Sequence, residues 1–262
     1  MPTAPINGIR LYYRAYGKGP ALVFAHGAGG NHLSWWQQTP QLAKRYRCVV
    51  FDHRAFGRSR DQRDGPGRRS FADDLRELLD LLNIEQTAIV AQSMGGRTAV
   101  GFALRNPDRV RALVLAGTTG GAVNDDIRKA QEAYRNTPAG RRSLAQRAVS
   151  PRLRRERPEL DHLYRLIGRL NPRRPRDFLA PIPGYRGSSA ERLAALGIPI
   201  LFLVGEEDTI TPPHIVRMAH EQVPGSQFDV IERAGHSAYF ERADAFNERV
   251  LRFLEQAGWA PE

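Results

Sequence analysis

Three side chains of the sequence have the types that nucleophilic catalysis requires, and each follows a short apolar run. Ser93 lies in "AQSMGGR", Asp208 lies in "GEEDTITPP", and His236 lies in "AGHSAYFE". A serine hydroxyl is a weak nucleophile at neutral pH and needs a base that takes its proton. A histidine can be that base, and an acid can orient its imidazole and stabilise the protonated form. We therefore expect the three residues to meet at one edge of a sheet.

Small residues surround Ser93, with Ala91 two positions before it and Gly95 two positions after it. A strand that turns sharply into a helix exposes the residue at the corner, provided that its neighbours let the strand and the helix approach. Glycine at both flanks is the usual pattern, and Ala91 departs from it by one methyl group. The alternative is a serine that only caps a helix. The chain order Ser, Asp, His favours the nucleophile.

The surrounding sequence predicts the elements that would position these residues. Five short apolar runs do not alternate with polar residues, as expected for strands buried on both faces; they are 21–25, 48–51, 87–91, 112–116 and 199–204. The stretch 9–17 alternates better and predicts a more exposed antiparallel start. Apolar residues recur at helical spacing in 71–82 and 246–254. The alternation of strand-like and helix-like segments along the chain predicts an α/β fold with a mostly parallel, doubly wound sheet.

Residues 120–189 interrupt this rhythm, because they are rich in arginine and proline and contain no strand-like run. Helical patterns appear at 125–135 and 160–170. We expect a helical, arginine-rich lid at 120–186, inserted after the sixth strand into a core of residues 1–119 and 187–262. It would cover the carboxyl edge of the sheet, where open α/β sheets bind ligands. A disordered linker is the alternative, and the apolar residues at 160–170 disfavour it.

The formal net charge is +11, and 36 of the 39 basic residues are arginine. Residues 120–189 hold 16 basic and 7 acidic residues, so most of the net charge belongs to the expected lid. This concentration disfavours a nucleic-acid-binding protein. Two interpretations stay open: the arginines only solvate a surface, or some of them bind an anionic substrate.

Other classes of protein are disfavoured by what the sequence omits. There is no apolar stretch of 18 residues, so no membrane span or membrane partner is expected, and the start lacks a secretory pattern. Cys48, the single cysteine, lies in an apolar run and cannot build a disulfide framework. No grouping of histidines and acids suggests a metal site, so neither metal nor cofactor is expected. A cytoplasmic location is the default, and no oligomeric state is predicted.

The segments "HGAGG", "DHRAFGRS", "AQSMGGR", "GEEDTITPP" and "GHSAYFE" occur in the order found in one family. The sequence resembles the α/β-hydrolase-fold serine enzymes over essentially its whole length, and within them it is similar to an esterase and enol-lactonase-like branch with a lid domain. The resemblance implies that Ser93, His236 and Asp208 form a catalytic triad. It also implies that backbone N–H groups of Ala28 and Met94 stabilise the tetrahedral oxyanion. The second segment resembles a family turn, with alanine in place of its first glycine.

Three functions are compatible with these residues, each with a small-molecule partner. The first is hydrolysis of a carboxylic ester or lactone through an acyl-enzyme on Ser93. The second is C–C bond hydrolysis, or elimination of pyruvate as in a lyase of this family whose corresponding arginine contacts substrate. Arg97 stands in that place, and with lid arginines it would hold an anionic, carboxylated substrate; pairing with an acid is its alternative. The third is a non-catalytic ligand-binding module.

Four further side chains near these segments have expected roles. Trp35, Trp36 and Tyr239 follow the expected oxyanion loop or the expected base, and they are candidates for shaping an apolar pocket. Ordinary packing is the alternative for each. His26 precedes the glycine-rich turn, and we expect it to order that loop by hydrogen bonds rather than to act as the base.

Overall fold

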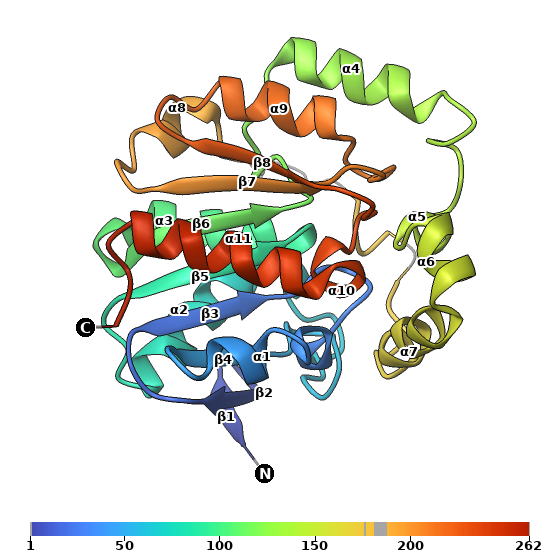
Figure 1. The fold of residues 1–262 in the computed structure, drawn as a ribbon. Helices are drawn as coiled ribbons and strands as arrows, with labels where there is room; N and C mark the ends of the chain where they lie inside the picture. Colours follow the sequence, from blue (N-terminus) through green and yellow to red (C-terminus); the bar gives the residue numbers. More distant parts are fainter. Residues whose placement is uncertain (1, 176, 181–187, 262) are drawn as a thin grey trace.

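The computed structural model describes residues 2–175, 177–180 and 188–261. The strands are β1 (Thr3–Ile6), β2 (Ile9–Tyr16), β3 (Ala21–Ala25), β4 (Arg47–Phe51), β5 (Thr87–Gln92), β6 (Val110–Ala116), β7 (Ile200–Gly205) and β8 (Gln227–Ile231). They form one sheet in the order β1-β2-β4-β3-β5-β6-β7-β8 (Figure 1). The β1/β2 and β2/β4 pairs are antiparallel, and the other neighbouring pairs are parallel. The predicted α/β fold class is confirmed.

Burial on both faces explains why the central strands read as continuous apolar runs. Every residue of β3, β5 and β7 is buried. Along β3, Val23 packs into the core on one face of the sheet, whereas Leu22 and Phe24 pack into the core on the other. Such a strand needs an apolar side chain at each position, so polar residues collect at its ends.

Helices cover both faces of the sheet. They are α1 (Thr39–Leu42), α2 (Phe71–Leu81), α3 (Met94–Arg105), α4 (Asp125–Arg135), α5 (Leu144–Arg147), α6 (Pro151–Glu156), α7 (Pro158–Arg169), α8 (Ala190–Ala194), α9 (Pro213–Glu221), α10 (Ala238–Glu241) and α11 (Ala243–Gln256). Short 3-10 helices are η1 (His32–Trp35), η2 (Gly67–Ser70) and η3 (Pro107–Arg109). Apolar residues of α2, α3, α8 and α9 pack on one face, and those of α1 and α11 pack on the other (Figure 1). Within the described residues, no helix is both long and apolar enough to cross a membrane.

In the described part of the chain between β6 and β7, the helices α4 to α7 precede α8, which leads into β7. Helices α5, α6 and α7 lie beyond the carboxyl ends of the central strands, and α4 lies beside α9 (Figure 1). We refer to the segment between β6 and α8, which carries α4 to α7, as the insertion. The domain boundary expected at 186/187 lies outside the described residues. The insertion places arginine-bearing helices over the sheet edge where β5, β6 and β7 end.

Candidate functional site

Ser93 lies at the corner between β5 and α3, with φ 51° and ψ −113°. A positive φ is strained for any residue except glycine, so the surrounding structure must hold it. The Ser93 N–H donates to the carbonyl oxygen of Ala116 on β6, at 2.9 Å. A Cβ at Gly95 would lie 2.2 Å from the carbonyl oxygen of Ala25, so only glycine lets α3 approach β3 this closely. The corner therefore presents the serine side chain at the carboxyl end of β5.

His236 and Asp208 form a buried pair at the same edge of the sheet. His236 Nδ1 lies 2.8 Å from Asp208 Oδ2, and the two residues are 6% and 3% exposed. The other carboxylate oxygen, Oδ1, accepts the N–H groups of Ile210 at 2.7 Å and Thr211 at 2.9 Å. These bonds fix the orientation of the carboxylate. Because an ionised carboxylate only accepts, Nδ1 donates to it, and Nε2 is left to accept a proton.

Two residues that the sequence does not single out support this pair. Gly117 follows β6 with φ 58°, and a Cβ there would lie 3.2 Å from both Asp208 Oδ2 and His236 Nδ1. Gln92 Nε2 donates to the carbonyl oxygen of His236 at 3.3 Å. Both residues sit at the carboxyl ends of predicted strands, which is the signal that could have identified them.

A cavity of about 560 Å³ opens at this edge, and Ser93 and His236 both line it. Asp208 lies behind His236. Within the described part of the chain, the Ser93 hydroxyl makes no direct hydrogen bond to His236. Catalytic hydrogen bonds are often long before substrate binds and shorten in the complex, so this geometry is compatible with a nucleophile and its base.

The two backbone groups expected to stabilise an oxyanion belong to residues that line the same cavity, Ala28 and Met94. Met94 is the first residue of α3, so its N–H has no partner within the helix. The loop that carries Ala28 is ordered by His26, whose Nδ1 donates to Gly27 O at 2.8 Å and whose Nε2 accepts the N–H of His53 at 3.0 Å. Burial lowers the pKa of His26 to about 4, which keeps the imidazole neutral and Nε2 able to accept.

The family model described as the alpha/beta hydrolase fold matches residues 20–243. The chain belongs to the α/β-hydrolase family. It is similar to the structure of a thermophilic esterase from Thermogutta terrifontis, with a TM-score of 0.80 and 27% identity over 98% of this chain and 97% of that one. It is also similar to the structure of the enol-lactonase from Burkholderia xenovorans LB400, with a TM-score of 0.78 and 25% identity over 97% and 100%.

A curated relative of this α/β hydrolase is the 2-hydroxy-6-oxononadienedioate/2-hydroxy-6-oxononatrienedioate hydrolase of Paraburkholderia phymatum. The two sequences are 30% identical over 274 residues, which cover 95% of this chain and 92% of the relative. The site that the sequence predicts thus lies in a chain whose relatives are named for ester, lactone and C–C bond hydrolysis.

Positive charge dominates the cavity wall of the hydrolase. Among the residues that the structure describes, five arginines of the core and the insertion line it: Arg68, Arg97, Arg165, Arg169 and Arg174. Asp161, the one carboxylate among the described lining residues, lies 2.7 Å from a guanidinium nitrogen of Arg165. Such a wall raises the local concentration of anions.

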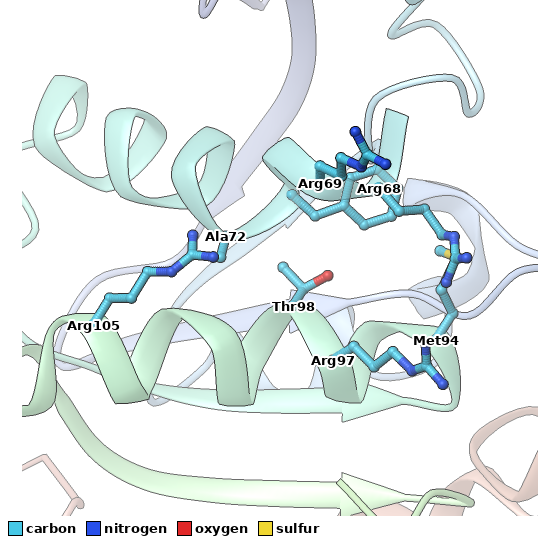
Figure 2. Close-up of a pocket in the computed structure, with 8 residues that line it drawn as sticks. Arg68, Arg69, Ala72, Met94, Arg97, Thr98 and Arg105 are labelled. Atoms are coloured by element: carbon cyan, nitrogen blue, oxygen red, sulfur yellow. The ribbon is translucent and has the colours of Figure 1, made fainter. Parts of the chain in front are cut away.

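Arg68 and Arg97 both lie beside Met94, which lines the same cavity (Figure 2). Burial, followed by the positive charge of Arg97, lowers the pKa of Arg68. Neither arginine forms an ion pair with an acid among the residues that the structure describes. The alternative in which Arg97 pairs with an acid on a neighbouring helix is therefore not supported.

Trp35, Trp36 and Tyr239 were expected to shape an apolar pocket at this site, and that expectation is wrong. None of the three is among the described residues that line the cavity at Ser93. Trp35 and Tyr239 are almost fully buried in the core, and their ring centroids are 4.7 Å apart. Trp36 is 42% exposed and lines a separate cavity beside α6. Trp35 is the last residue of η1 and packs inward on Phe24, whereas Trp36 follows the helix and faces outward.

Histidine, cysteine, aspartate and glutamate are the side chains that most often bind metal ions in proteins. Within residues 2–175, 177–180 and 188–261, no group of three or more of them could hold a metal ion. Cys48 is buried, and burial raises the pKa of its thiol to about 12. It therefore packs as a small apolar residue.

Proposed function

We propose that this α/β hydrolase cleaves a carboxylic ester or a lactone through an acyl-enzyme on Ser93. One observation carries the proposal: a serine held at a strained corner shares a cavity with a histidine whose Nδ1 is bound by a buried aspartate. Strain at a single non-glycine residue persists only where its surroundings enforce it, and it clusters at functional sites. Ser93, His236 and Asp208 would then act as nucleophile, base and orienting acid.

The reaction would proceed in two halves. Ser93 Oγ attacks the carbonyl carbon while His236 Nε2 takes the hydroxyl proton, and the carbonyl oxygen becomes an oxyanion. His236 then gives that proton to the leaving alkoxide, and the acyl group stays on Ser93 as an ester. Water attacks this ester with His236 again as base, and the carboxylic acid and free serine are released. In a lactone, the alcohol and the acid belong to one product molecule.

The N–H groups of Ala28 and Met94 would bind the oxyanion in both halves. Removing one such donor typically costs roughly 10²–10³-fold in rate. The insertion would act as a lid, because side chains of α5 and α7 and their flanking segments form much of the cavity wall. An apolar part of this wall suits an acyl chain: Leu144, Ala148, Val149, Leu179 and Ile210.

The test combines covalent labelling with substrate turnover. A fluorophosphonate probe should label the wild-type protein at Ser93 and leave Ser93→Ala unlabelled. A panel of short and long p-nitrophenyl esters and lactones should be hydrolysed by the wild type, with Ser93→Ala reduced by at least roughly 10³-fold. Ser93→Ala that turns over esters at the wild-type rate would remove the nucleophile assignment. If the wild-type protein is not labelled and hydrolyses none of these substrates, a ligand-binding module is favoured.

A second candidate function is C–C bond hydrolysis of a carboxylated substrate. The five arginines of the cavity favour it, because they offer an anion more guanidinium groups than the lining acids neutralise. The name of the Paraburkholderia phymatum relative specifies a dioate, a compound with two carboxylates. Adding vinylogous diketones with and without a carboxylate to the panel separates this function from ester hydrolysis.

A further inference from the structure

We infer that Asn171 and Arg174 of the insertion are positioning residues that hold the Ala28 N–H in place for the oxyanion. This inference rests on the proposed function, because it assigns a role to the oxyanion loop, residues 27–31. Both side chains follow the end of α7 and cross from the insertion to that loop. We call Asn171 and Arg174, together with Asn31, the loop clamp.

Asn171 connects the oxyanion loop to a second core loop. Its Nδ2 donates to Gly30 O at 3.1 Å and lies 3.5 Å from Gly29 O. Its Oδ1 accepts the N–H of Gly57 at 2.8 Å. One carboxamide thus uses both ends to fix two loops relative to each other. Alanine at this position would leave these carbonyls and the Gly57 N–H without their partner.

Arg174 makes the same connection with a charged group. Its guanidinium donates to Ala55 O at 3.2 Å and to Ala28 O at 3.4 Å. It also lies over the Phe56 ring, 3.9 Å from the centroid, which fixes the plane of the guanidinium. Ala55 has φ 66°, and its carbonyl accepts one of these bonds. Arg174 therefore holds the residue whose N–H is the expected oxyanion donor.

The end of α7 also contacts the oxyanion loop directly. Asn31 is 1% exposed, and its Nδ2 donates to Ile167 O at 2.8 Å. A Cβ at Gly168 would lie 3.1 Å from Gly29 O, so the helix backbone approaches the loop closely. The carbonyls of residues 28, 29 and 30 consequently all meet groups of the insertion. The insertion does more than cover the cavity, because it determines where the loop lies.

The consequence for catalysis follows from geometry. An oxyanion donor is effective only within about 2.7–3.1 Å of the charged oxygen, and a shift of about 1 Å costs roughly 10²-fold in rate. A loop released from one clamp residue would relax by part of that distance. The loss should therefore fall on the oxyanion and spare ground-state binding, which lowers kcat and leaves KM nearly unchanged.

The experiment compares an oxygen ester with its thionoester, whose developing thiolate-like sulfur is a poor acceptor for the same N–H groups. Asn171→Ala and Arg174→Ala should each lower kcat for the oxygen ester roughly 10-fold, and the double variant roughly 10²-fold. The kcat for the thionoester should fall by less than roughly 3-fold in each case. Arg174→Lys, which retains a donor, should recover part of the loss. Arg173→Ala removes an exposed neighbour outside the cavity and serves as the matched control.

Each result has a distinct meaning. Equal losses on both esters, or a loss confined to KM, would overturn the inference. Losses that track a lowered thermal midpoint and appear equally in Arg173→Ala would also overturn it. Ser93→Ala, run in parallel, keeps the two proposals apart: full turnover by that variant rejects the nucleophile itself. An inactive Ser93→Ala with clamp variants that behave as wild type rejects only the positioning role.

Discussion

His236 Nδ1 lies 2.8 Å from Asp208 Oδ2, and two backbone N–H groups hold the other oxygen of the same carboxylate. An asparagine at position 208 would present either its NH₂ group, which cannot accept the Nδ1–H, or its oxygen, which carries no negative charge to stabilise the imidazolium. We therefore expect Asp208→Asn to lower kcat on an active ester by roughly 10³–10⁴-fold with little change in KM. Steady-state kinetics at neutral pH measure this. A loss below 10-fold would contradict the orienting role. Glu206→Gln changes an acid outside the cavity and is the control.

Arg97 should discriminate between neutral and anionic substrates. Mono-p-nitrophenyl glutarate carries a carboxylate that p-nitrophenyl valerate lacks, and both have the same scissile bond. We expect Arg97→Ala to raise KM for the glutarate roughly 10-fold, because a charge-assisted hydrogen bond is typically worth about 1.5–3 kcal/mol. The valerate should be unaffected. Arg69→Ala removes an exposed arginine outside the catalytic cavity and is the control. Equal changes for both esters would argue against an anion site.

His26 should make folding stability depend on pH. Burial lowers its pKa from 6.5 to about 4, so the unfolded chain binds the proton more readily than the folded chain. The stabilisation is fully present above pH 6.5 and is lost as pH falls towards 4. Between pH 7.5 and 5.5, we expect this histidine to contribute a loss of about 1 kcal/mol. Urea unfolding of wild type and His26→Gln measures the difference in slope, and identical slopes would count against it.

Arg54 should be important for stability, because it is 1% exposed and its guanidinium binds a buried acid. Its Nε and Nη2 lie 2.9 and 2.7 Å from the two oxygens of Asp74, which is also 1% exposed. Removing one partner leaves a buried charge unpaired, so Arg54→Ala should lower the free energy of unfolding by about 3–5 kcal/mol. The Arg54→Met/Asp74→Leu double variant, which removes both charges, should lose less stability than Arg54→Ala. Arg60→Ala, at an exposed position, should change stability by no more than about 0.5 kcal/mol.

The sheet was predictable because each buried strand must supply apolar side chains to two faces. The runs at 21–25 and 87–91 coincide with β3 and most of β5, and the ends of these strands place Ser93 and its neighbours at one edge. Strand β1 escaped the pattern, since only four residues of a sheet edge show too little periodicity. The glycine-rich corner at Ser93 was predictable for a different reason: close approach of two backbones permits few residue types.

Side-chain partners that are distant in the sequence were not predictable. Asn171 and Gly30 lie 141 positions apart, and no local pattern connects a carboxamide after one helix to a carbonyl after one strand. The aromatic residues show the opposite error: nearness in sequence to the oxyanion loop suggested a pocket, but the direction of η1 sends Trp35 into the core. The charge of the sequence helped to disfavour a class of protein, but it did not predict ion pairs. Which arginine lies next to which carboxylate depends on the fold.

Ser188 Oγ donates to the carbonyl oxygen of Gly120 at 2.6 Å, so the chain leaves the core after β6 and returns to it before α8 at nearly the same point. The insertion therefore begins and ends at neighbouring points, so its length need not alter the spacing of β6 and β7. Loop closure costs grow only slowly with length. The strands of the sheet can therefore tolerate a longer, shorter or unrelated segment between these residues, whereas residues 28–31 would lose the contacts that Ile167, Asn171 and Arg174 make. The junction is a natural position for exchanging one segment for another, and a replacement would have to supply its own contacts to residues 28–31 as well as its own cavity wall.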